Sequence, residues 1–251
     1  MHLYPLVKTK EQVIGSDSTP HVLNFYFQES GSFLDIGGNR GNILHFNCAA
    51  VNQCSYTSID VSKDAIKEGK TTFNQSKFLH WDRFNWIYNK TGSIDAPLPE
   101  FPTHDYSFAC NVFNSTDFLD LLYIVESVWN KTSKKFVFSV YDKSNTSLWT
   151  KFYDHMKLNE SIIYSQQTVN FTQWCNNAHN ICYLKDNCVE EFNSLSFKPV
   201  HHSNKIDCKS FLTGYDLIWL YNMLKLNIDA KITIHDRCQI DSNMSIVVLE
   251  R

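Results

Sequence analysis

The stretch SFLDIGGNRGNIL, residues 32–44, joins a short apolar run to a turn that contains three glycines. Asp35 lies near the end of the apolar run, and Gly37, Gly38 and Gly41 follow it closely. Glycine permits a positive φ and lets a ligand approach the main chain without meeting a Cβ atom. The stretch therefore predicts a buried strand, then a ligand-binding turn, then the start of a helix.

Four more apolar runs follow this stretch and alternate with segments of helical pattern. Such alternation predicts βαβ units and an α/β fold with a mainly parallel sheet covered by helices on both faces. The further strands are expected at 55–61, 76–82, 106–113 and 134–142, and the helices at 21–30, 40–50, 62–73 and 115–130. Ser62 is the expected N-cap of the third of these helices.

After residue 142 the regular alternation ends. Helices are expected at 146–158, 186–195 and 209–226, extended segments at 161–174 and 196–202, and a last strand at 245–250. We interpret residues 1–20 as a flexible arm and 21–251 as one domain. Within that domain, residues 33–142 are expected to bind a cofactor and residues 143–251 an acceptor.

Composition limits the classes of partner. The formal net charge of −3 argues against a general polyanion-binding face, and no run of residues is long and apolar enough for a membrane span. The first residues lack the pattern of a secretory signal, so a cytoplasmic location and reduced thiols for the eight cysteines are expected.

Three acids follow successive predicted strands: Asp35, Asp60 and Asp82. Ligands of open parallel sheets bind beyond the carboxyl ends of the strands, where these acids would meet. A dinucleotide site needs G-x-G-x-x-G, whereas here G-G-N-R-G follows an acid that would repel a phosphate. The pattern favours a cationic ligand that carries a nucleoside; the alternative is that the acids only cap the following helices.

These motifs resemble those of the class I S-adenosylmethionine-dependent methyltransferases. FLDIGGNRGNIL is similar to their first motif, YTSIDVSKDAI to their ribose-binding strand end and FLHWD to their adenine-contact strand. The resemblance implies a Rossmann-like fold with a seven-stranded sheet and S-adenosylmethionine as cofactor. It assigns cofactor binding to Asp35, Gly37, Gly38, Asn39, Gly41, Asp60, Val61, Trp81, Asp82 and Asn111. Asn39 replaces the usual middle glycine, and asparagine tolerates a left-handed φ better than other residues with a side chain.

The fourth predicted strand ends in ACNVF, which has neither an acid nor a lysine to deprotonate an acceptor. An acceptor that is already nucleophilic, such as guanine N7, needs no general base, so proximity and orientation suffice for direct SN2 transfer. The segments HVLNFYFQES, SFACNVFNSTDFLDLL and ICYLKDNCVEEFNSLSFKPVHH also resemble segments of the mRNA cap guanine-N7 methyltransferases, including viral ones. That resemblance implies a capped RNA 5′ end as substrate, other capping or replicase proteins as partners, and the host cytoplasm as location.

The cap-binding residues implied by this second resemblance are Asn24, Arg40, Phe113, Asn114 and Tyr183. The chain departs from the cap family where that family has a lysine in its N-terminal helix and a glutamate before its late helix. Two alternatives therefore stay open: a catalytically inactive binding or stimulatory subunit, and a methyltransferase for another acceptor, such as an RNA 2′-hydroxyl, a small molecule or a protein side chain. A separate set, Cys175, His179, Cys182 and Cys188, has the residue types of a zinc site, with free thiols as the alternative.

Overall fold

The structure is a computed structural model, and its helices and strands alternate from the first motif onward. It describes residues 19–46, 48, 50–81, 98–113, 118–142, 162–164, 179–184, 210–235 and 244–251. The helices are α2 (Thr19–Tyr26), η1 (Asn42–His45, a 3-10 helix), α3 (Lys63–Thr72), α5 (Phe118–Trp129) and α9 (Leu217–Asn227). The strands are β1 (Gly31–Ile36), β2 (Val51–Asp60), β3 (Lys77–His80), β4 (His104–Ala109), β5 (Thr132–Asp142), β6 (Ile162–Tyr164), β7 (His179–Leu184), β8 (Ser210–Tyr215), β9 (Lys231–His235) and β10 (Ser245–Glu250).

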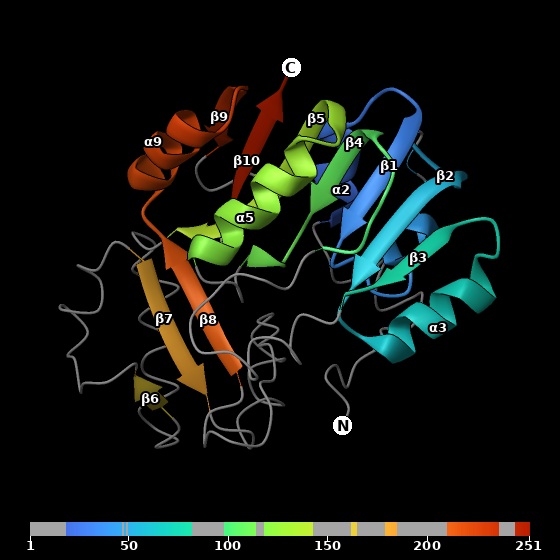
Figure 1. Cartoon of the computed structure of the whole chain (residues 1–251), viewed down its shortest axis with the longest axis horizontal. Helices are drawn as coiled ribbons and strands as arrows, with labels where there is room; N and C mark the ends of the chain where they lie inside the picture. The colour runs from blue at the N-terminus through green and yellow to red at the C-terminus, as the bar shows by residue number, and fades with distance from the viewer. Residues whose placement is uncertain are drawn as a thin grey trace.

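The main sheet has the strand order β3-β2-β1-β4-β5-β10-β9 (Figure 1). The first five strands are parallel to one another, and β10 runs antiparallel to both of its neighbours. This arrangement confirms the predicted mainly parallel, seven-stranded sheet. A second ladder, β8-β7-β6, is antiparallel and joins the main sheet through a short parallel pairing of β8 with the end of β5.

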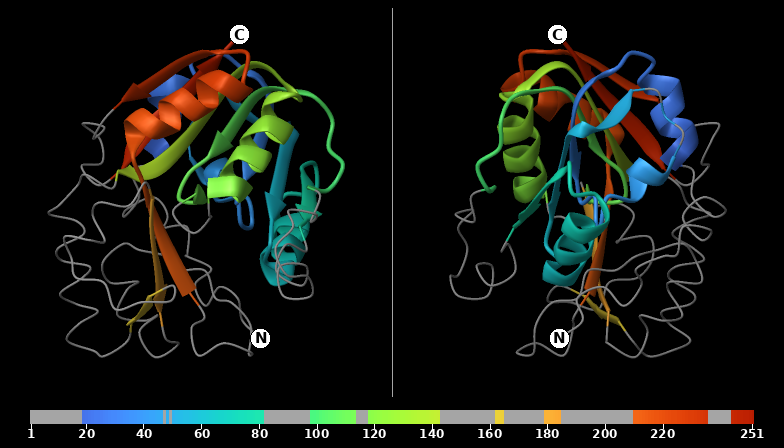
Figure 2. Two further views of the ribbon diagram at one scale, coloured as in Figure 1. Left: turned by 60° about the vertical axis from the view of Figure 1, so that its left-hand side comes forward. Right: turned by 90° about the vertical axis from the view of Figure 1, so that its right-hand side faces the viewer.

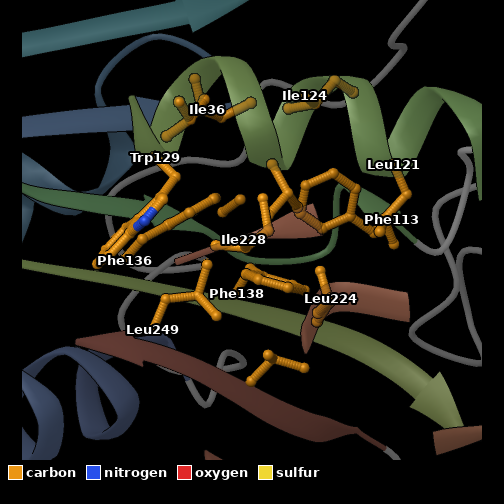
Figure 3. Packing of buried hydrophobic residues seen from close by; sticks show 14 of the residues in the cluster. Ile36, Phe113, Leu121, Ile124, Trp129, Phe136, Phe138, Leu224, Ile228 and Leu249 are labelled. Atoms are coloured by element: carbon orange, nitrogen blue, oxygen red, sulfur yellow. The ribbon is translucent and has the colours of Figure 1, made fainter. Parts of the chain in front are cut away.

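Helices cover both faces of the main sheet (Figure 2). On one face, α5 and α9 pack against inward-facing residues of the strands, and Figure 3 shows Leu121 and Ile124 of α5 above Phe136 and Phe138 of β5. On the other face, α2, η1 and α3 contribute to a second buried cluster around Phe33. Because both faces are covered, strands such as β1 and β5 have mostly apolar centres, which made them recognisable in the sequence.

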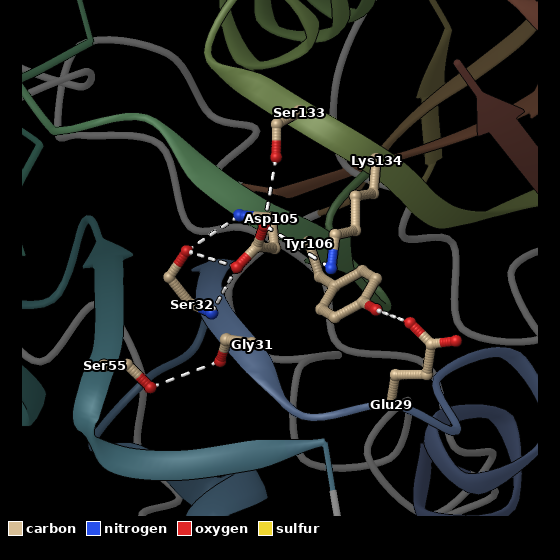
Figure 4. Close-up of polar contacts among 8 residues, drawn as sticks. All are labelled: Glu29, Gly31, Ser32, Ser55, Asp105, Tyr106, Ser133 and Lys134. Carbon is tan, nitrogen blue, oxygen red and sulfur yellow. Dashed lines mark hydrogen bonds and ion pairs between the residues drawn. The ribbon is translucent and has the colours of Figure 1, made fainter.

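The amino ends and the carboxyl ends of the parallel strands carry different polar residues. At the amino ends of the strands, Asp105 accepts hydrogen bonds from the amide and the hydroxyl of Ser32 (3.0 and 3.2 Å) and from the hydroxyl of Ser133 (Figure 4). Nearby, the Tyr106 hydroxyl lies 3.4 Å from a carboxylate oxygen of Glu29. These contacts join β1, β4 and β5 to one another at their amino ends. The predicted ligand-binding acids lie at the opposite, carboxyl ends of the strands.

Several predicted elements have other boundaries or another type in the structure. The helix expected at 209–226 is strand β8 followed by α9, because Asp216 caps a new helix by accepting a hydrogen bond from the Trp219 amide (3.0 Å). The helix expected at 40–50 is reduced to the single turn η1. Strand β9 was not predicted. The N-cap at Ser62 is confirmed, since its side chain accepts from the Ala65 amide.

Other predicted segments fall largely or wholly outside the described residues. They are the arm at 1–20, the helices at 146–158 and 186–195, the extended segment at 196–202, and all of 161–174 except β6. Among the helices in the described ranges, none has the length and apolar character that a membrane span requires.

Candidate cofactor-binding site

The loop after β1 turns through three left-handed residues. The φ angles are +70° at Gly37, +53° at Asn39 and +86° at Gly41. The Gly37 amide donates to the carbonyl of Ile59 (2.7 Å), and the Gly41 amide donates to the carbonyl of Gly38 (2.9 Å). The expectation that asparagine supports a left-handed turn at position 39 is therefore confirmed.

Two glycines of this loop lie against other parts of the site. A Cβ atom at Gly37 would collide with the Val112 side chain, which follows β4. A Cβ atom at Gly38 would lie 2.5 Å from Asp35 Oδ2 and 2.6 Å from Ser58 Oγ. The missing side chains thus let the loop pack closely on the end of β4 and on the carboxyl group of Asp35, with Gly37 exposed and Gly38 buried.

Asp60 joins three segments at the end of β2. Its Oδ2 accepts a hydrogen bond from the Asn39 amide and its Oδ1 one from the Ser62 amide, both at 2.8 Å, and its carbonyl accepts from the Trp81 amide. Burial raises the pKa of Asp60 above its usual value, and the bonds from backbone amides oppose that rise. Each carboxylate oxygen has a second lone pair, so Asp60 can hold the loop and still accept bonds from a ligand.

Asp35 lies at the end of β1 in a less polar setting. It is only 3% exposed, and its Oδ2 accepts a 2.7 Å hydrogen bond from the hydroxyl of Tyr56 on β2. Burial raises its pKa to about 7, the bond from Tyr56 lowers it, and the neighbouring charge of Asp60 raises it. Neither Tyr56 nor Ser58 was predicted as a site residue, because β2 (VNQCSYTSID) has polar residues at most of its positions and nothing in the sequence distinguishes these two.

The residues after β4 face the glycine loop. Asn111 has a φ of +58°, and its amide donates to the hydroxyl of Ser139 (2.9 Å). The Cys110 sulfur lies 3.8 Å from the Ser139 hydroxyl and 3.7 Å from the side-chain nitrogen of Asn111. The described residues after β4, Cys110 to Phe113, contain no carboxylate and no lysine, as the sequence indicated.

The structure corrects one predicted cap contact and places others. Phe113 is 0% exposed and packs edge-on against Phe138 (5.0 Å between ring centroids), so its ring is a core residue and is not available to stack on a base. Arg40 forms an ion pair with Glu68 of α3 (2.6 Å). Asn24 is exposed on α2. For the latter two, binding to the cap stays a prediction.

The remaining predicted site residues divide into two groups. Trp81 is buried at 6% exposure and Val61 packs against the same core cluster, and contact of either side chain with the cofactor stays a prediction. Asp82 and Asn114 lie outside the described residues, as do the side chains of Tyr183 and of the predicted zinc ligands. No cluster of three metal-ligating side chains occurs among the described residues.

Residues 34–130, from β1 to the end of α5, match the model of a methyltransferase domain family. No curated protein matches the chain in sequence. The described strand order, the glycine loop after β1 and the buried acids after β1 and β2 agree with that match. Over the matched residues the chain therefore has the Rossmann-like fold of class I methyltransferases.

Solved structures support the same fold over nearly the whole chain. The PH0226 protein from Pyrococcus horikoshii OT3 is similar with a TM-score of 0.54 and 12% identity, over 97% of this chain and 93% of that one. Magnesium protoporphyrin IX methyltransferase from Synechocystis PCC 6803, with bound SAH, gives 0.51 and 9% over 99% and 90%. The glycopeptide N-methyltransferase MtfA, complexed with S-adenosylmethionine, gives 0.51 and 12% over 94% and 87%.

Proposed function

We propose that this chain is an S-adenosylmethionine-dependent methyltransferase whose acceptor is N7 of the guanine cap of an RNA. The observation that carries the first part is the junction at Asp60, where one buried carboxylate fixes both the left-handed loop and the start of α3. The methyltransferase domain match and the solved structures with bound cofactor support the same part.

The residues at the junction have separate roles in this proposal. The backbone of Gly37 to Gly41 and the carboxyl group of Asp35, which lies directly against Gly38, receive the amino acid part of the cofactor. Asp60 accepts hydrogen bonds from the ribose hydroxyls with its remaining lone pairs. When bound, S-adenosylmethionine supplies an electrophilic methyl group on a sulfonium.

The acceptor is proposed from the end of β4. A ribose hydroxyl must lose its proton during transfer, which requires a base, whereas guanine N7 has a free lone pair. The described residues after β4 offer the thiol of Cys110, held near Ser139, and the amide of Asn111, but no carboxylate or ammonium group. An acceptor that needs only positioning fits such a set better than one that needs deprotonation.

Cofactor binding is tested by calorimetry with the Asp60→Ala variant. We expect at least a tenfold weaker affinity for S-adenosylmethionine, because the variant loses both the ribose contact and the support of Asn39. Asp229→Ala is the matched control: Asp229 is exposed before β9, and only its backbone carbonyl is used, by Trp129. Equal affinity of the Asp60→Ala variant and the unmodified protein would contradict the proposed cofactor site.

The acceptor is tested by incubation with labelled S-adenosylmethionine and three short RNAs. They carry an unmethylated cap, an N7-methylated cap or no cap. Label on the unmethylated cap alone is the expected result. Label on the N7-methylated cap would instead indicate a 2′-hydroxyl acceptor. If no RNA is labelled although the cofactor binds, the acceptor assignment is wrong and the cofactor assignment survives.

A further inference from the structure

We infer that Tyr56 is a positioning residue that, through Asp35, sets the pH range in which the site accepts its cationic cofactor. The inference rests on the proposed function, since it concerns regulation of the same site. It goes beyond that proposal because Tyr56 belongs to the interior of β2 and would touch the cofactor only through the carboxyl group of Asp35.

The geometry couples Tyr56 to the ligand-binding loop through one carboxylate oxygen. The Tyr56 hydroxyl lies 2.7 Å from Asp35 Oδ2, and this same oxygen lies 2.5 Å from the point that a Cβ at Gly38 would occupy. Tyr56 is 1% exposed and its ring packs against Phe78, with centroids 6.1 Å apart. The hydroxyl therefore fixes the Asp35 carboxyl group directly beneath the loop.

A second buried hydroxyl reaches the same point. Ser58 pairs with Asp35 in the β1–β2 register and is fully buried. Its Oγ would lie 2.6 Å from a Cβ at Gly38, and a hydrogen bond between Ser58 and the Tyr56 hydroxyl opposes the rise in the pKa of Tyr56. Tyr56 and Ser58 thus place two buried hydroxyl groups beside the Asp35 carboxyl group and close to Gly38.

Among the described residues, few charged or titratable groups lie at the carboxyl ends of the strands that flank Asp35. At the ends of β2 and β4 these are Tyr56, Asp60 and Cys110; the loop adds Arg40, which is paired with Glu68. Burial raises the pKa of Tyr56 well above its usual value, so its hydroxyl remains the donor. Since burial raises the pKa of Asp35 to about 7 and the bond from Tyr56 opposes that rise, removing the hydroxyl must raise it further.

The expected pH dependence follows from the charge of each partner. Asp35 attracts a cation only when ionised, so affinity for S-adenosylmethionine should increase as pH rises through about 7. An α-amino group loses its proton above a pKa of about 8, so affinity should fall again at higher pH. In Tyr56→Phe the rise of affinity with pH, the acid limb of the profile, should move to higher pH, while the fall at high pH, the alkaline limb, should stay where it is. At pH 7 the affinity should fall by about fivefold.

The experiment measures the dissociation constant of S-adenosylmethionine by calorimetry between pH 5.5 and 9 for four proteins. They are the unmodified chain, Tyr56→Phe, Asp35→Asn and Tyr106→Phe. Tyr106→Phe is the matched control, because Tyr106 also places its hydroxyl near a carboxylate, that of Glu29, at the opposite edge of the sheet (Figure 4). We expect the acid limb to move only in Tyr56→Phe and to vanish in Asp35→Asn.

The carboxyl carbon of Asp35, followed by NMR in the cofactor-free protein, gives a second measurement that needs no binding. An unchanged midpoint of its titration in Tyr56→Phe would overturn the inference, and so would an acid limb that persists in Asp35→Asn, because Asp60 would then be the titrating group. A midpoint that moves in a protein that binds no cofactor at any pH would overturn the proposed function and leave the coupling of Tyr56 to Asp35 supported.

Discussion

At the scale of single residues, two buried acids in one site have different surroundings and different consequences. Asp60 accepts hydrogen bonds from two backbone amides, and these bonds favour its charged form. The same bonds hold the glycine loop and the start of α3 in place. Asp35 accepts one hydroxyl in an almost fully buried position, and its pKa is raised to about 7. The protein thus folds around one carboxyl group that resists ionisation and that is adjacent to a proposed cation site.

Replacing Asp35 by asparagine should change how stability depends on pH. A raised pKa means that native Asp35 holds a proton that the unfolded chain releases between about pH 4 and 7, so its contribution to stability is present at low pH and lost as pH rises through 7. Asparagine does not titrate. From pH 5 to 8, Asp35→Asn should therefore gain about 2–3 kcal/mol relative to the unmodified protein, measured by urea unfolding.

Asp105→Asn serves as the control for that measurement. Its pKa is lowered, first by the bond from the Ser32 amide, so Asp105 is ionised in both native and unfolded states above pH 5. Its stability difference should stay constant from pH 5 to 8. A constant difference for Asp35→Asn as well would show that Asp35 ionises at its usual pH.

The sequence predicts the acids of the site but not the groups that act on them. Asp35 and Asp60 were recognisable because each ends a buried run, and a strand end is a local property. Tyr56 and Ser58 meet Asp35 only through the register of β1 against β2, which is a property of the folded sheet. The prediction for Phe113 was wrong for the same reason. An aromatic residue that follows a strand gives the same sequence pattern whether its ring faces the core or a ligand.

At the scale of elements, the contact between α3 and β3 depends on one glycine. Gly69 lies in the middle of α3, where glycine is normally unfavourable compared with alanine. A Cβ at this position would collide with the ring of Phe78 on β3, which is 2% exposed. The missing side chain lets α3 pack closely on β3, the strand that pairs with β2 and therefore lies next to Asp60.

Gly69→Ala should therefore destabilise the protein, although the same change stabilises most exposed helices. We expect a loss of about 1–3 kcal/mol in the free energy of unfolding, because the buried ring must move. Thr72→Ala, at an exposed position of the same helix, is the control and should be neutral or slightly stabilising. An increase in stability for Gly69→Ala would mean that Phe78 has room to yield.

The error at 209–226 has a clear physical cause. Residues 209–226 contain apolar residues almost throughout, and a continuous apolar run does not reveal its period over so few residues. The boundary is set by Asp216, whose side chain caps α9. The strands of residues 33–142 were easier to predict from the sequence, because turns and glycines separate them.

At the scale of the whole molecule, the sheet should be most resistant to opening at its centre. In the described part of the chain, β3 and β9 each pair with one strand of the main sheet, whereas β1, β4, β5 and β10 are paired on both sides. Hydrogen exchange should therefore be slowest for amides of β5 and β10, such as Val137 and Val247, and faster in β3 and β9. Equal protection of β3 and β5 would contradict a stability gradient set by strand order.

The position of β10 has a consequence for how the chain folds during synthesis. Residues 245–250 lie between β5 and β9, so one edge of β5 stays without this partner for more than a hundred residues of translation. The pairing of Ile246 with Ser139 spans a long loop, and closing such a loop slows folding. The parallel strands β1 to β5 can form early in synthesis, but β5 lacks its partner β10 until residues 245–250 are made. During that time the unpaired backbone of β5 is exposed. An unpaired strand is a site where a nascent chain can pair with another copy and aggregate.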